Sequence, residues 1–407
     1  MIAFHFPPAA MGSGHLRTLG FVRYLPEFGW EPIVLTATSG AYPRVDGRNS
    51  ILIPPDCEVH RAFSLDSGRH LALRGKYPGV LATPDRWVSW WPLAVSKGLR
   101  LIRRYRMDAI WSTYPIMTAH CVAGALSRLT GLPWIADFRD PVAGSVSSQN
   151  HLAAMFQQRY ERSVVRHADH VVFTTPGALQ GCSESYADAA RAAKFRVIPN
   201  GYDETLFGEL PPVRPPVTGR PLLLVHSGLL YGEGRNPMAF FQAVAALKQQ
   251  QVLSAHDVKV VLRASGLEET YATAIERLRI DDIVSLAPLI DQQAALHEQA
   301  QADGLLLLQG QRFNQQIPAK VYEYLRIGRP ILALVDATGD TAALLRSSGG
   351  AELASIDDRA AIEKHLMTFI ETLRTGGGPR SSPAVVAGLS RRAGANTLAG
   401  MLQGLIH

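Results

Sequence analysis

Residues 315–335 read QQIPAKVYEYLRIGRPILALV and contain a complete helix followed by a strand. Pro318 favours the first turn of a helix, and the apolar face that starts at Val321 recurs at i+3 and i+4. Gly328 ends the helix, and the apolar run 331–335 has the length and composition of a buried strand. This stretch therefore predicts a helix that packs on a parallel sheet.

The first turn of this helix carries a lysine. The positive end of the helix dipole already faces that way, so Lys320 is unfavourable unless an anion lies nearby. Glu323 lies three residues on, beside Lys320, so one short helix offers a cation and a carboxylate that accepts hydrogen bonds from hydroxyl groups. This pair suits the phosphates and the ribose of a sugar nucleotide. The alternative is a solvated ion pair on a surface helix.

Strand-like runs alternate with helical runs along the chain, starting with IAFHF at residues 2–6. Apolar runs with strand composition separate a series of predicted helices, which we expect over 15–28, 117–130, 151–167, 237–249, 268–279 and 291–300. This repeated order predicts α/β domains, each with a parallel sheet and with helices on both faces.

The proline-rich run PPVRPPVTGRP at residues 211–221 interrupts this pattern, and we interpret it as an inter-domain linker. We predict an N-terminal Rossmann-like domain over 1–210, a C-terminal Rossmann-like domain over 222–386 and a terminal helix over 387–407. Two doubly wound domains of this kind are expected to face each other across a cleft that holds the ligand.

Composition limits the class of protein. The chain has 407 residues, of which 47% are hydrophobic and 19% charged, as in a soluble globular protein. Its apolar runs are far shorter than the roughly 20 residues of a membrane-spanning helix, and strand-like residues directly after Met1 leave no room for a signal peptide. Cys57, Cys121 and Cys182 are odd in number and fit no zinc spacing, so we expect a cytoplasmic protein with neither a structural metal nor a disulfide.

The net charge of +6 is concentrated in one segment, residues 61–106, which has many arginines and also contains Trp87, Trp90 and Trp91. Arginines beside tryptophans suit a patch that contacts an anionic membrane surface, which would place the protein peripherally on the inner face of the plasma membrane. A buried aromatic cluster beside a solvated basic helix is the equally supported alternative. No helix-turn-helix, zinc or RNA-binding signature accompanies the charge, so nucleic acid is not an expected partner.

The first loop, PPAAMGSGHLR at residues 7–17, is glycine-rich and precedes a helix, as phosphate-binding loops do. Gly12 and Gly14 lack the third glycine of the dinucleotide fingerprint, and Thr36 stands where nicotinamide binding requires an acidic residue. These two departures exclude a dehydrogenase. Contact with a phosphate and a plain tight turn both remain open for this loop.

Five motifs occur in a fixed order along the chain. They are the PP…GSG-x-x-R start, WIADFRDP at 134–141, VIPNGYDETLF at 197–207, SGLLYGEGRNP at 227–237 and PAKVYEYLRIGRPILAL at 318–334. Together they resemble the motifs of retaining glycosyltransferases of family 4, and the resemblance covers nearly the whole chain. It implies the GT-B fold, with two Rossmann-like domains, and a second domain that binds a nucleotide sugar.

The resemblance also implies roles for single residues. Arg235, in the loop that begins at Gly228, matches a basic residue that contacts the donor diphosphate. Glu323 matches the second glutamate of the family's E-x7-E motif, which holds the ribose hydroxyls. The glycines of the first loop, Gly12 and Gly14, and Gly228 of the second domain are also expected to bind the donor.

The sequence departs from the family pattern at two positions. Gln315 stands where the first glutamate of the E-x7-E motif is expected, so the sugar ring of the donor would meet a neutral amide. Leu229 stands where many members place a second phosphate-binding arginine. Lys320 would restore that charge, and a bound diphosphate would explain why the helix tolerates a lysine in its first turn.

The chemistry follows from the chain's polar residues. No Asp-x-Asp occurs in the sequence, so we expect a metal-independent enzyme without a cofactor, whose basic side chains neutralise the leaving diphosphate. The resemblance places Arg139 and Asp140 near the transferred sugar and the acceptor, although an internal ion pair explains them nearly as well. With Gln315 they are the candidate catalytic residues. His15 and His120 are more readily explained as structural.

Three hypotheses remain. The first is a glycosyltransferase that builds a cell-surface polysaccharide, a lipopolysaccharide or a lipid-linked glycan. The second is another GT-B enzyme, such as a nucleotide-sugar epimerase, for which water-activating acids are expected in the cleft. The third is a noncatalytic subunit that binds a sugar nucleotide, which Gln315 leaves open.

Overall fold

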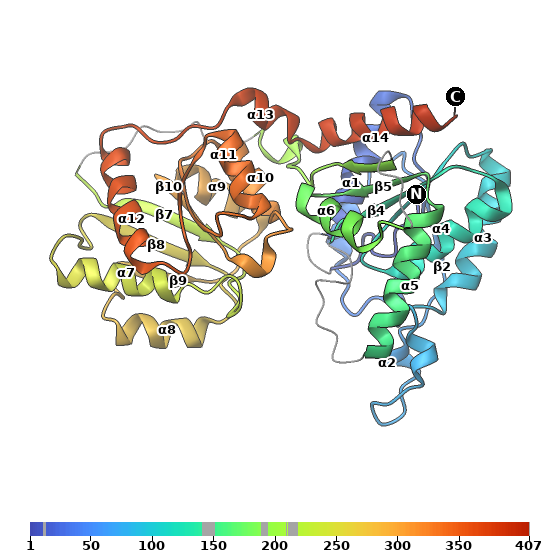
Figure 1. Cartoon of the computed structure of the whole chain (residues 1–407), viewed down its shortest axis with the longest axis horizontal. Helices are drawn as coiled ribbons and strands as arrows, with labels where there is room; N and C mark the ends of the chain where they lie inside the picture. The colour runs from blue at the N-terminus through green and yellow to red at the C-terminus, as the bar shows by residue number, and fades with distance from the viewer. Residues whose placement is uncertain (11–13, 141–150, 189–193, 209, 211–218, 407) are drawn as a thin grey trace. The chain divides into compact units, whose positions relative to one another are not determined.

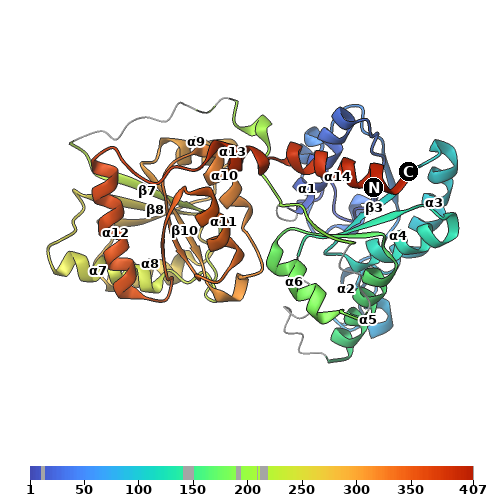
Figure 2. The same ribbon diagram turned by 45° about the horizontal axis from the view of Figure 1, so that its top comes forward.

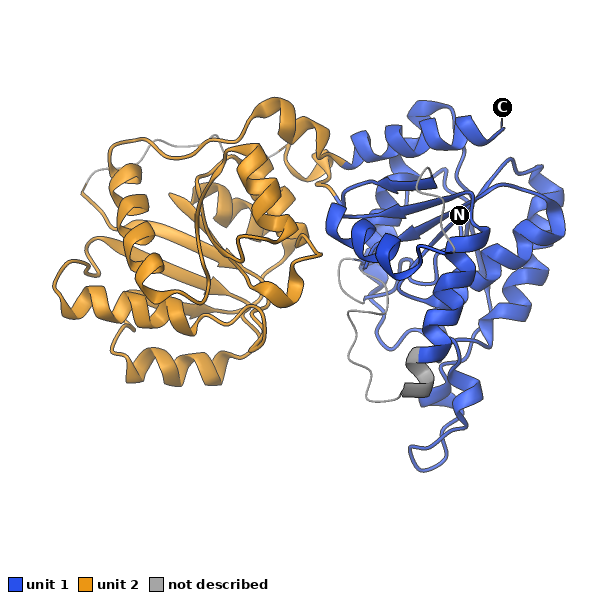
Figure 3. Cartoon of the chain, in the orientation of Figure 1, with its two compact units in different colours: residues 1–200, 391–407 blue, residues 201–390 orange. Residues whose placement is uncertain are grey.

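The structure is a computed structural model of the chain, and it describes residues 1–10, 14–140, 151–188, 194–208, 210 and 219–406, without the side chains of residues 151–154. The chain forms two compact units (Figure 3). The first unit contains residues 1–200 and 391–407, and the second contains residues 201–390. Most of the predicted proline-rich linker lies outside the described residues.

This division differs from the predicted boundary after residue 210. Tyr202 pairs with Ser390, and Phe207 is buried in the core of the second unit, so the segment after residue 200 already belongs to that unit. The predicted terminal helix over 387–407 is two helices, α13 (Pro383–Gly388) and α14 (Arg391–Ile406). Helix α14 packs on α1 of the first unit, so the end of the chain returns to that unit.

The first unit is built on a parallel sheet. Its named strands are β1 (Val34–Ala37), β2 (Val59–Ala62), β3 (Ile110–Thr113), β4 (Trp134–Phe138), β5 (His170–Phe173) and β6 (Phe195–Val197). Strand β1 pairs with β2, and β3 to β6 pair in sequence order. Ile2 forms parallel bridges to Leu35 of β1 and Ser112 of β3, so the start of the chain joins the two groups of strands.

The predicted strand at residues 2–6 is shorter than expected. Only its beginning pairs with β1 and β3, through backbone hydrogen bonds of Met1, Ile2 and Ala3. The hydroxyl groups of Thr36 and Tyr42 donate to the Phe4 carbonyl at 2.9 and 2.8 Å. These side chains take the acceptor that a neighbouring strand would use, and the chain leaves the sheet there.

Helices cover both faces of this sheet (Figure 1). One face is covered by α3 (Trp90–Tyr105), α4 (Met117–Thr130), α5 (His151–His167) and α6 (Pro176–Ser185), whose buried side chains join one hydrophobic core. The other face is covered by α1 (Gly14–Tyr24) and α14, around Phe21, Trp111 and Leu398. A short helix, α2 (Ser67–His70), lies in the connection from β2 to α3.

The second unit has one six-stranded parallel sheet. Its strands are β7 (Leu222–Ser227), β8 (Val258–Arg263), β9 (Val284–Ala287), β10 (Gly304–Gln309), β11 (Ile331–Val335) and β12 (Ala351–Ala354), in the spatial order β12-β11-β10-β7-β8-β9. The apolar run that opened the sequence analysis is β11, and every residue of it is buried.

The helices of the second unit also form two layers (Figure 2). The core on one face contains side chains of α7 (Met238–Gln249), α8 (Glu268–Arg277) and α12 (Arg359–Arg374). The core on the other face contains side chains of α9 (Gln292–Gln301), α10 (Ala319–Ile327), α11 (Asp340–Ser348) and α13. The predicted α/β class with two doubly wound domains is therefore confirmed.

The three tryptophans of the basic segment do not share one environment. Trp87 and Trp90 are buried and their rings contact Phe4 in the core of the first unit, whereas Trp91 is 42% exposed. The expectation that all three reach a membrane surface is wrong for Trp87 and Trp90, because the core takes their large apolar rings. Among the described residues, no helix is long and apolar enough to cross a membrane.

A buried ion pair ties α1 to β4. The guanidinium of Arg17 donates to the Asp137 carboxylate at 2.9 and 2.7 Å and to the Pro199 carbonyl at 2.9 Å. Thr113 donates a further hydrogen bond to the same carboxylate. Both charged side chains are almost fully enclosed, so each depends on the other to offset the cost of leaving water.

We predict that Arg17→Met destabilises the protein by about 3–5 kcal/mol, because it leaves the Asp137 carboxylate buried without a counter-charge. Urea unfolding measures the change, and the midpoint of Arg17→Met should be lower than that of the wild type. The matched control is Arg48→Met, which removes the exposed pair with Asp46 and should leave the midpoint unchanged. Equal unfolding midpoints for the two variants would show that the buried pair does not hold α1 in place.

Candidate functional site

The strand order of the second unit reverses between β7 and β10, so the chain leaves these two neighbouring strands toward opposite faces. In parallel sheets of this kind, ligands bind outside the carboxyl ends of the strands at such a point. The loops that follow β7 and β10 meet there, since the Gly310 N–H donates to the Gly234 carbonyl at 2.6 Å. The predicted donor-binding residues of this unit lie on these loops and on α10.

Lys320 lies in the first turn of α10, as predicted, and its side chain reaches the end of β7. A Cβ atom on Gly228 would lie 3.0 Å from Lys320 Nζ, and Gly228 has a φ of +102°. Glycine is favoured at this position because other residues rarely adopt a positive φ. A side chain there would also come too close to the Lys320 amine. The loop thus brings its backbone against the lysine.

His226, at the penultimate position of β7, holds the amine of Lys320. The imidazole is fully buried, with Nδ1 2.9 Å from the Leu306 carbonyl and Nε2 3.2 Å from Lys320 Nζ. Burial lowers the pKa of His226 well below its usual value, so the ring is neutral. Nε2 also lies 3.0 Å from the Gly228 carbonyl. The tautomer protonated at Nδ1 donates to Leu306 and accepts a Lys320 N–H at Nε2, whereas the tautomer protonated at Nε2 donates to Gly228.

Arg235 follows β7 on the loop and is fixed by a buried amide. Its guanidinium donates to Gln309 Oε1 at 2.9 Å and stacks near the rings of Tyr231 and Phe313, at 5.2 and 4.9 Å from their centroids. The amide nitrogen of Gln309 in turn donates to the carbonyls of Phe313 and Gln316. The Gln309 amide is therefore fixed with its oxygen toward Arg235. Because an amide is neutral, it does not compensate the positive charge of the guanidinium.

The electrostatics of this site favour an anion. Burial, and after it the positive charge of Arg235, lower the pKa of Lys320 from 10.5 to about 7, against the smaller effect of Glu323. Burial also lowers the pKa of Arg235. Two enclosed cations that disfavour each other would both be stabilised by a bound dianion, and the first turn of α10 adds backbone N–H groups with the same preference.

The other predicted residues of this unit surround the two cations at greater distance. Glu323 lies on α10 and accepts a long hydrogen bond of 3.4 Å from Gln292 of α9. Gln315 is exposed on the loop before α10. Leu229, at the position of the expected second arginine, is 49% exposed and its side chain lies against Gly266.

The predicted residues of the first unit gather at the carboxyl ends of its strands. Arg139 follows β4, and its guanidinium occupies the space that a Cβ on Gly14 would fill, so the glycine at the start of α1 makes room for it. Arg139 Nε lies 3.7 Å from the Asp140 carboxylate, which is beyond hydrogen-bond distance. Burial lowers the pKa of Arg139. Gly12, the other glycine predicted there, lies outside the described residues.

A half-buried histidine, His5, lies beside Arg139. Burial, then the charges of Arg139, His15 and Arg86, lower the pKa of His5 to about 4, so its ring is neutral at physiological pH. His5 Nε2 has no hydrogen-bond partner in the part of the chain that the structure describes. His15 lies at the start of α1 and is buried, and His120 is buried in α4 with Nδ1 2.8 Å from Ser112 Oγ.

Sequence reasoning did not identify His226, Gln309, Tyr231, Phe313 or His5. A polar residue at the carboxyl end of an otherwise apolar strand is the available signal, and it fits His226 in LLLVHSG and Gln309 in GLLLLQ. The contacts of Tyr231 and Phe313 with Arg235 depend on how the two loops fold onto each other.

The described residues contain no cluster of three or more histidine, cysteine, aspartate or glutamate side chains with the geometry of a metal site.

Comparison with known proteins adds two findings. Residues 13–201 match the family of the glycosyl transferase 4-like domain. A search of curated protein sequences gave no significant match.

Solved structures with a similar fold cover nearly the whole chain. Sucrose-phosphate synthase from Thermosynechococcus elongatus has 15% identity and a TM-score of 0.66, and covers 99% of this chain and 98% of its own. Anabaena HepE, solved with UDP and glucose, has 15% identity, a TM-score of 0.61 and the same coverage. The lipopolysaccharide outer core galactosyltransferase WaaB has 12% identity and a TM-score of 0.64, and covers 99% of both chains.

We predict that Lys320→Met stabilises the ligand-free protein, and that this gain shrinks as the pH rises. The unfolded chain binds the lysine proton more tightly than the folded protein does, because folding lowers the pKa from 10.5 to about 7. The buried charge therefore destabilises the wild type fully below pH 7, and this penalty disappears toward pH 10.5. Urea unfolding of both proteins across this range measures the difference.

The matched control is Lys364→Met, because Lys364 is exposed on α12. Its effect on stability should be small and should not change between pH 7 and 10. A Lys320→Met variant that is less stable than the wild type at pH 7 would show that the lysine is held by a favourable ion pair.

Proposed function

We propose that the chain is a glycosyltransferase of the GT-B type, because residues 13–201 match the glycosyl transferase 4-like domain and the whole chain has the GT-B fold. From this premise we propose that it is a retaining, metal-independent enzyme that moves a sugar from a nucleotide-sugar donor to a cell-surface polysaccharide, a lipopolysaccharide or a lipid-linked acceptor. The observation that carries the donor assignment is the pair of enclosed cations, Lys320 and Arg235, at the switch point of the second unit.

In this proposal the diphosphate of the donor binds between Lys320, Arg235 and the N–H groups at the start of α10. The negative charge on the leaving phosphate grows as the sugar–oxygen bond breaks, and preorganised cations stabilise that charge without a metal ion. The leaving phosphate accepts the proton of the attacking acceptor hydroxyl, on the same face of the sugar. No protein nucleophile is needed.

The remaining roles follow the residues already placed. Glu323 accepts hydrogen bonds from the ribose hydroxyls, and Gly228 admits the diphosphate because its backbone has no side chain. Gln315 faces the sugar ring with an amide. Arg139 and Asp140 contribute from the first unit to the sugar and the acceptor, and Gly14 leaves space for Arg139.

Two comparisons support the substrate classes. The HepE structure contains UDP and glucose, which makes a UDP-sugar the first donor to test. WaaB is described as a lipopolysaccharide galactosyltransferase, which supports a glycan acceptor at the cell surface. A nucleotide-sugar epimerase and a noncatalytic binding subunit are the alternatives, and release of UDP that depends on an acceptor separates the transferase from both.

We predict that Glu323→Ala weakens the binding of both UDP and uridine. Lys320→Met should weaken the binding of UDP and leave the affinity for uridine unchanged. Each charge-assisted hydrogen bond to the ligand is worth about 1.5–3 kcal/mol, which corresponds to roughly 10-fold to 100-fold in affinity. The ribose is present in both ligands, but only UDP carries the diphosphate. Isothermal titration measures the four affinities.

Glu276→Ala and Lys364→Met are the controls, because both residues are exposed on helices away from the loops of the site. If Glu323→Ala and the wild type bind UDP with equal affinity, the assignment of the donor site is wrong. Acceptor-dependent UDP release from a panel of UDP-sugars, unchanged by EDTA, then tests transfer and the absence of a metal requirement.

The proposal includes peripheral binding to an anionic membrane on its cytoplasmic face. The surface that suits this role is the basic loop, residues 67–84, which contains three basic residues and no acidic residue. Its apolar side chains point to solvent, since Leu73 is 80% and Val80 75% exposed. Apolar side chains that enter the headgroup layer beside cations are what binding to anionic lipid requires.

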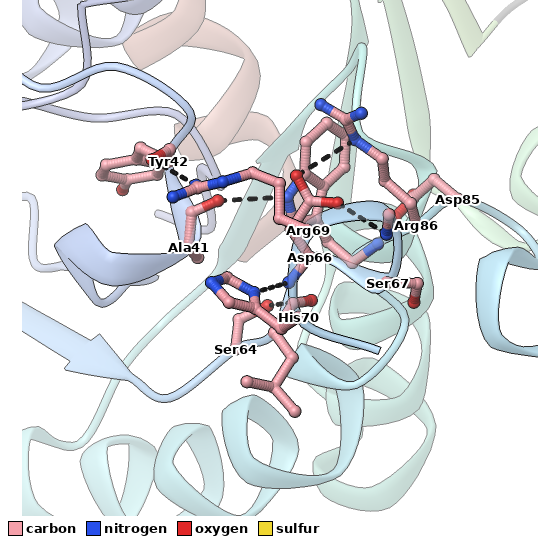
Figure 4. Close-up of polar contacts among 12 residues, drawn as sticks. Ala41, Tyr42, Ser64, Asp66, Ser67, Arg69, His70, Asp85 and Arg86 are labelled. Carbon is pink, nitrogen blue, oxygen red and sulfur yellow. Dashed lines mark hydrogen bonds and ion pairs between the residues drawn. The ribbon is translucent and has the colours of Figure 1, made fainter. Parts of the chain in front are cut away.

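Polar contacts hold the base of the basic loop (Figure 4). The buried Asp66 carboxylate accepts from the Gly68 N–H at 3.0 Å, and the Asp66 N–H donates to His70 Nδ1 at 2.9 Å. Arg69 donates to the Tyr42 carbonyl at 2.7 Å. The loop extends beyond α2 in Figure 1, so its apolar residues are presented from a fixed base.

We predict that the protein sediments with vesicles that contain phosphatidylglycerol, and that Leu73→Ser with Val80→Ser abolishes most of this binding. Each basic residue near an anionic surface contributes about 1 kcal/mol, and salt screens this contribution. The control Leu129→Ser changes a leucine on α4 that is 64% exposed, and this variant should bind as the wild type does. Binding that ignores salt or lipid charge would contradict the electrostatic part.

A further inference from the structure

A cavity of about 380 Å³ lies in the helical layer of the first unit, between α4 and α5. Trp134 of β4 also lines it, as do Pro84 and Val88 from the segment before α3. It is separate from the loops at the carboxyl ends of the strands, which hold Arg139 and Gly14. Its volume lies in the range of small-molecule sites, about 300–1,000 Å³.

The cavity exists because α4 presents small side chains where it faces α5. Cys121, Gly124 and Ala125 form this side of the cavity, opposite Tyr160 and Val164 of α5. A Cβ at Gly124 would lie 3.3 Å from the ring of Trp134, which is a tight contact, so glycine lets the helix approach this ring closely. The surroundings are apolar enough that burial raises the pKa of the Cys121 thiol to about 12.

The two ends of the cavity differ in chemistry. At one end the indole N–H of Trp91 donates to the Cys121 carbonyl at 3.2 Å, and the ring is 42% exposed. At the other end Arg128 Nη2 lies 3.1 Å from His167 Nδ1, which also lies 2.7 Å from the Ser163 carbonyl. The lining residues span α4 from Thr118 to Arg128, about 15 Å at the rise of an α-helix.

This shape and polarity select one kind of occupant. An apolar cavity that is lined along about 15 Å of α4 and has a cation at one end is complementary to a hydrocarbon chain that carries an anionic head group. Among the described residues the lining contains no aspartate or glutamate, and Asp85 accepts hydrogen bonds from Thr118, at the opposite end of the α4 lining from Arg128. Pro84, which lines the cavity, is also the last residue of the basic loop, so a chain that leaves a bilayer at that loop is already beside the opening.

We propose that the cavity between α4 and α5 binds one hydrocarbon chain of an anionic amphiphile, with the chain along Cys121, Gly124 and Ala125 and the head group at Arg128. The chain belongs to a membrane phospholipid or to a lipid-linked acceptor, and both have this chemistry. The site is independent of the donor site, because none of its lining residues belongs to the second unit.

The test is titration of dodecyl phosphate, below its micelle concentration, into the full-length protein. Ala125→Trp fills the cavity and should weaken binding at least about 10-fold. Arg128→Gln should weaken the binding of dodecyl phosphate but not that of dodecyl maltoside, because the maltoside head group is neutral. The matched controls are Leu129→Trp, at an exposed position beside Arg128, and Arg103→Gln on α3, which do not line the cavity and should bind as the wild type does.

A second measurement does not depend on the folding of any variant. Iodoacetamide alkylation of Cys121, followed by mass spectrometry at alkaline pH, should slow when dodecyl phosphate is present, while alkylation of the half-buried Cys57 on the same protein should not. Equal rates for Cys121 with and without the ligand would overturn the proposal. Equal binding by Ala125→Trp and Leu129→Trp would overturn it as well.

Two further arms identify the source of the chain. Stronger competition by lysophosphatidylglycerol than by farnesyl phosphate assigns the site to phospholipid, and the reverse order assigns it to an isoprenoid-linked acceptor. If size-exclusion chromatography shows a dimer that Ala125→Trp dissociates, the cavity is an interface with a second copy and the proposal is wrong. UDP affinity is measured in parallel and should be unchanged in all four variants, so failure of this site is distinct from failure of the donor site.

Discussion

The enclosure of two cations at the end of β7 is the constraint on which the donor site depends. Lys320 and Arg235 each lose hydration in the folded protein, which lowers the pKa of both, and the charge of Arg235 lowers the pKa of Lys320 further. Neutral groups lie against them, since His226 Nε2 is 3.2 Å from the lysine amine and Gln309 accepts from the arginine. Two cations that are held by neutral groups lower the stability of the ligand-free protein, and a bound anion would offset this loss.

The topology of the second unit explains why these groups meet. The strand order reverses between β7 and β10, so the chain continues from these two strands toward opposite faces of the sheet, while the loops directly after them meet at the Gly310–Gly234 hydrogen bond. His226 and Gln309 lie at the ends of these two strands, and α10 follows β10 after a nine-residue connection, with Lys320 in its first turn. A site with polar groups fixed from strands and a helix needs little rearrangement when the ligand binds.

The first unit uses its two helical layers differently. At the strand ends, Arg139 is placed over Gly14 by the close approach of α1, while the buried pair of Arg17 and Asp137 holds that helix on β4. In the α3–α5 layer, small residues such as Gly124 leave space between α4 and α5. The polar loops and the apolar cavity thus serve different ligands within one parallel sheet and its connections.

The sequence by itself determined the α/β class and most helix positions, because apolar periodicity and glycine or proline stops are local; α4 and α5 have the predicted bounds. It also showed that no neighbouring residue in the sequence explains a lysine in the first turn of the helix, at position 320. Only the tertiary structure decided that Trp87 and Trp90 are core residues, that residues 201–210 belong to the second unit and that α14 returns to the first. His226, Gln309 and the rings beside Arg235 come from segments distant in the chain, and their contacts arise when β7 and β10 pair, which no local pattern encodes.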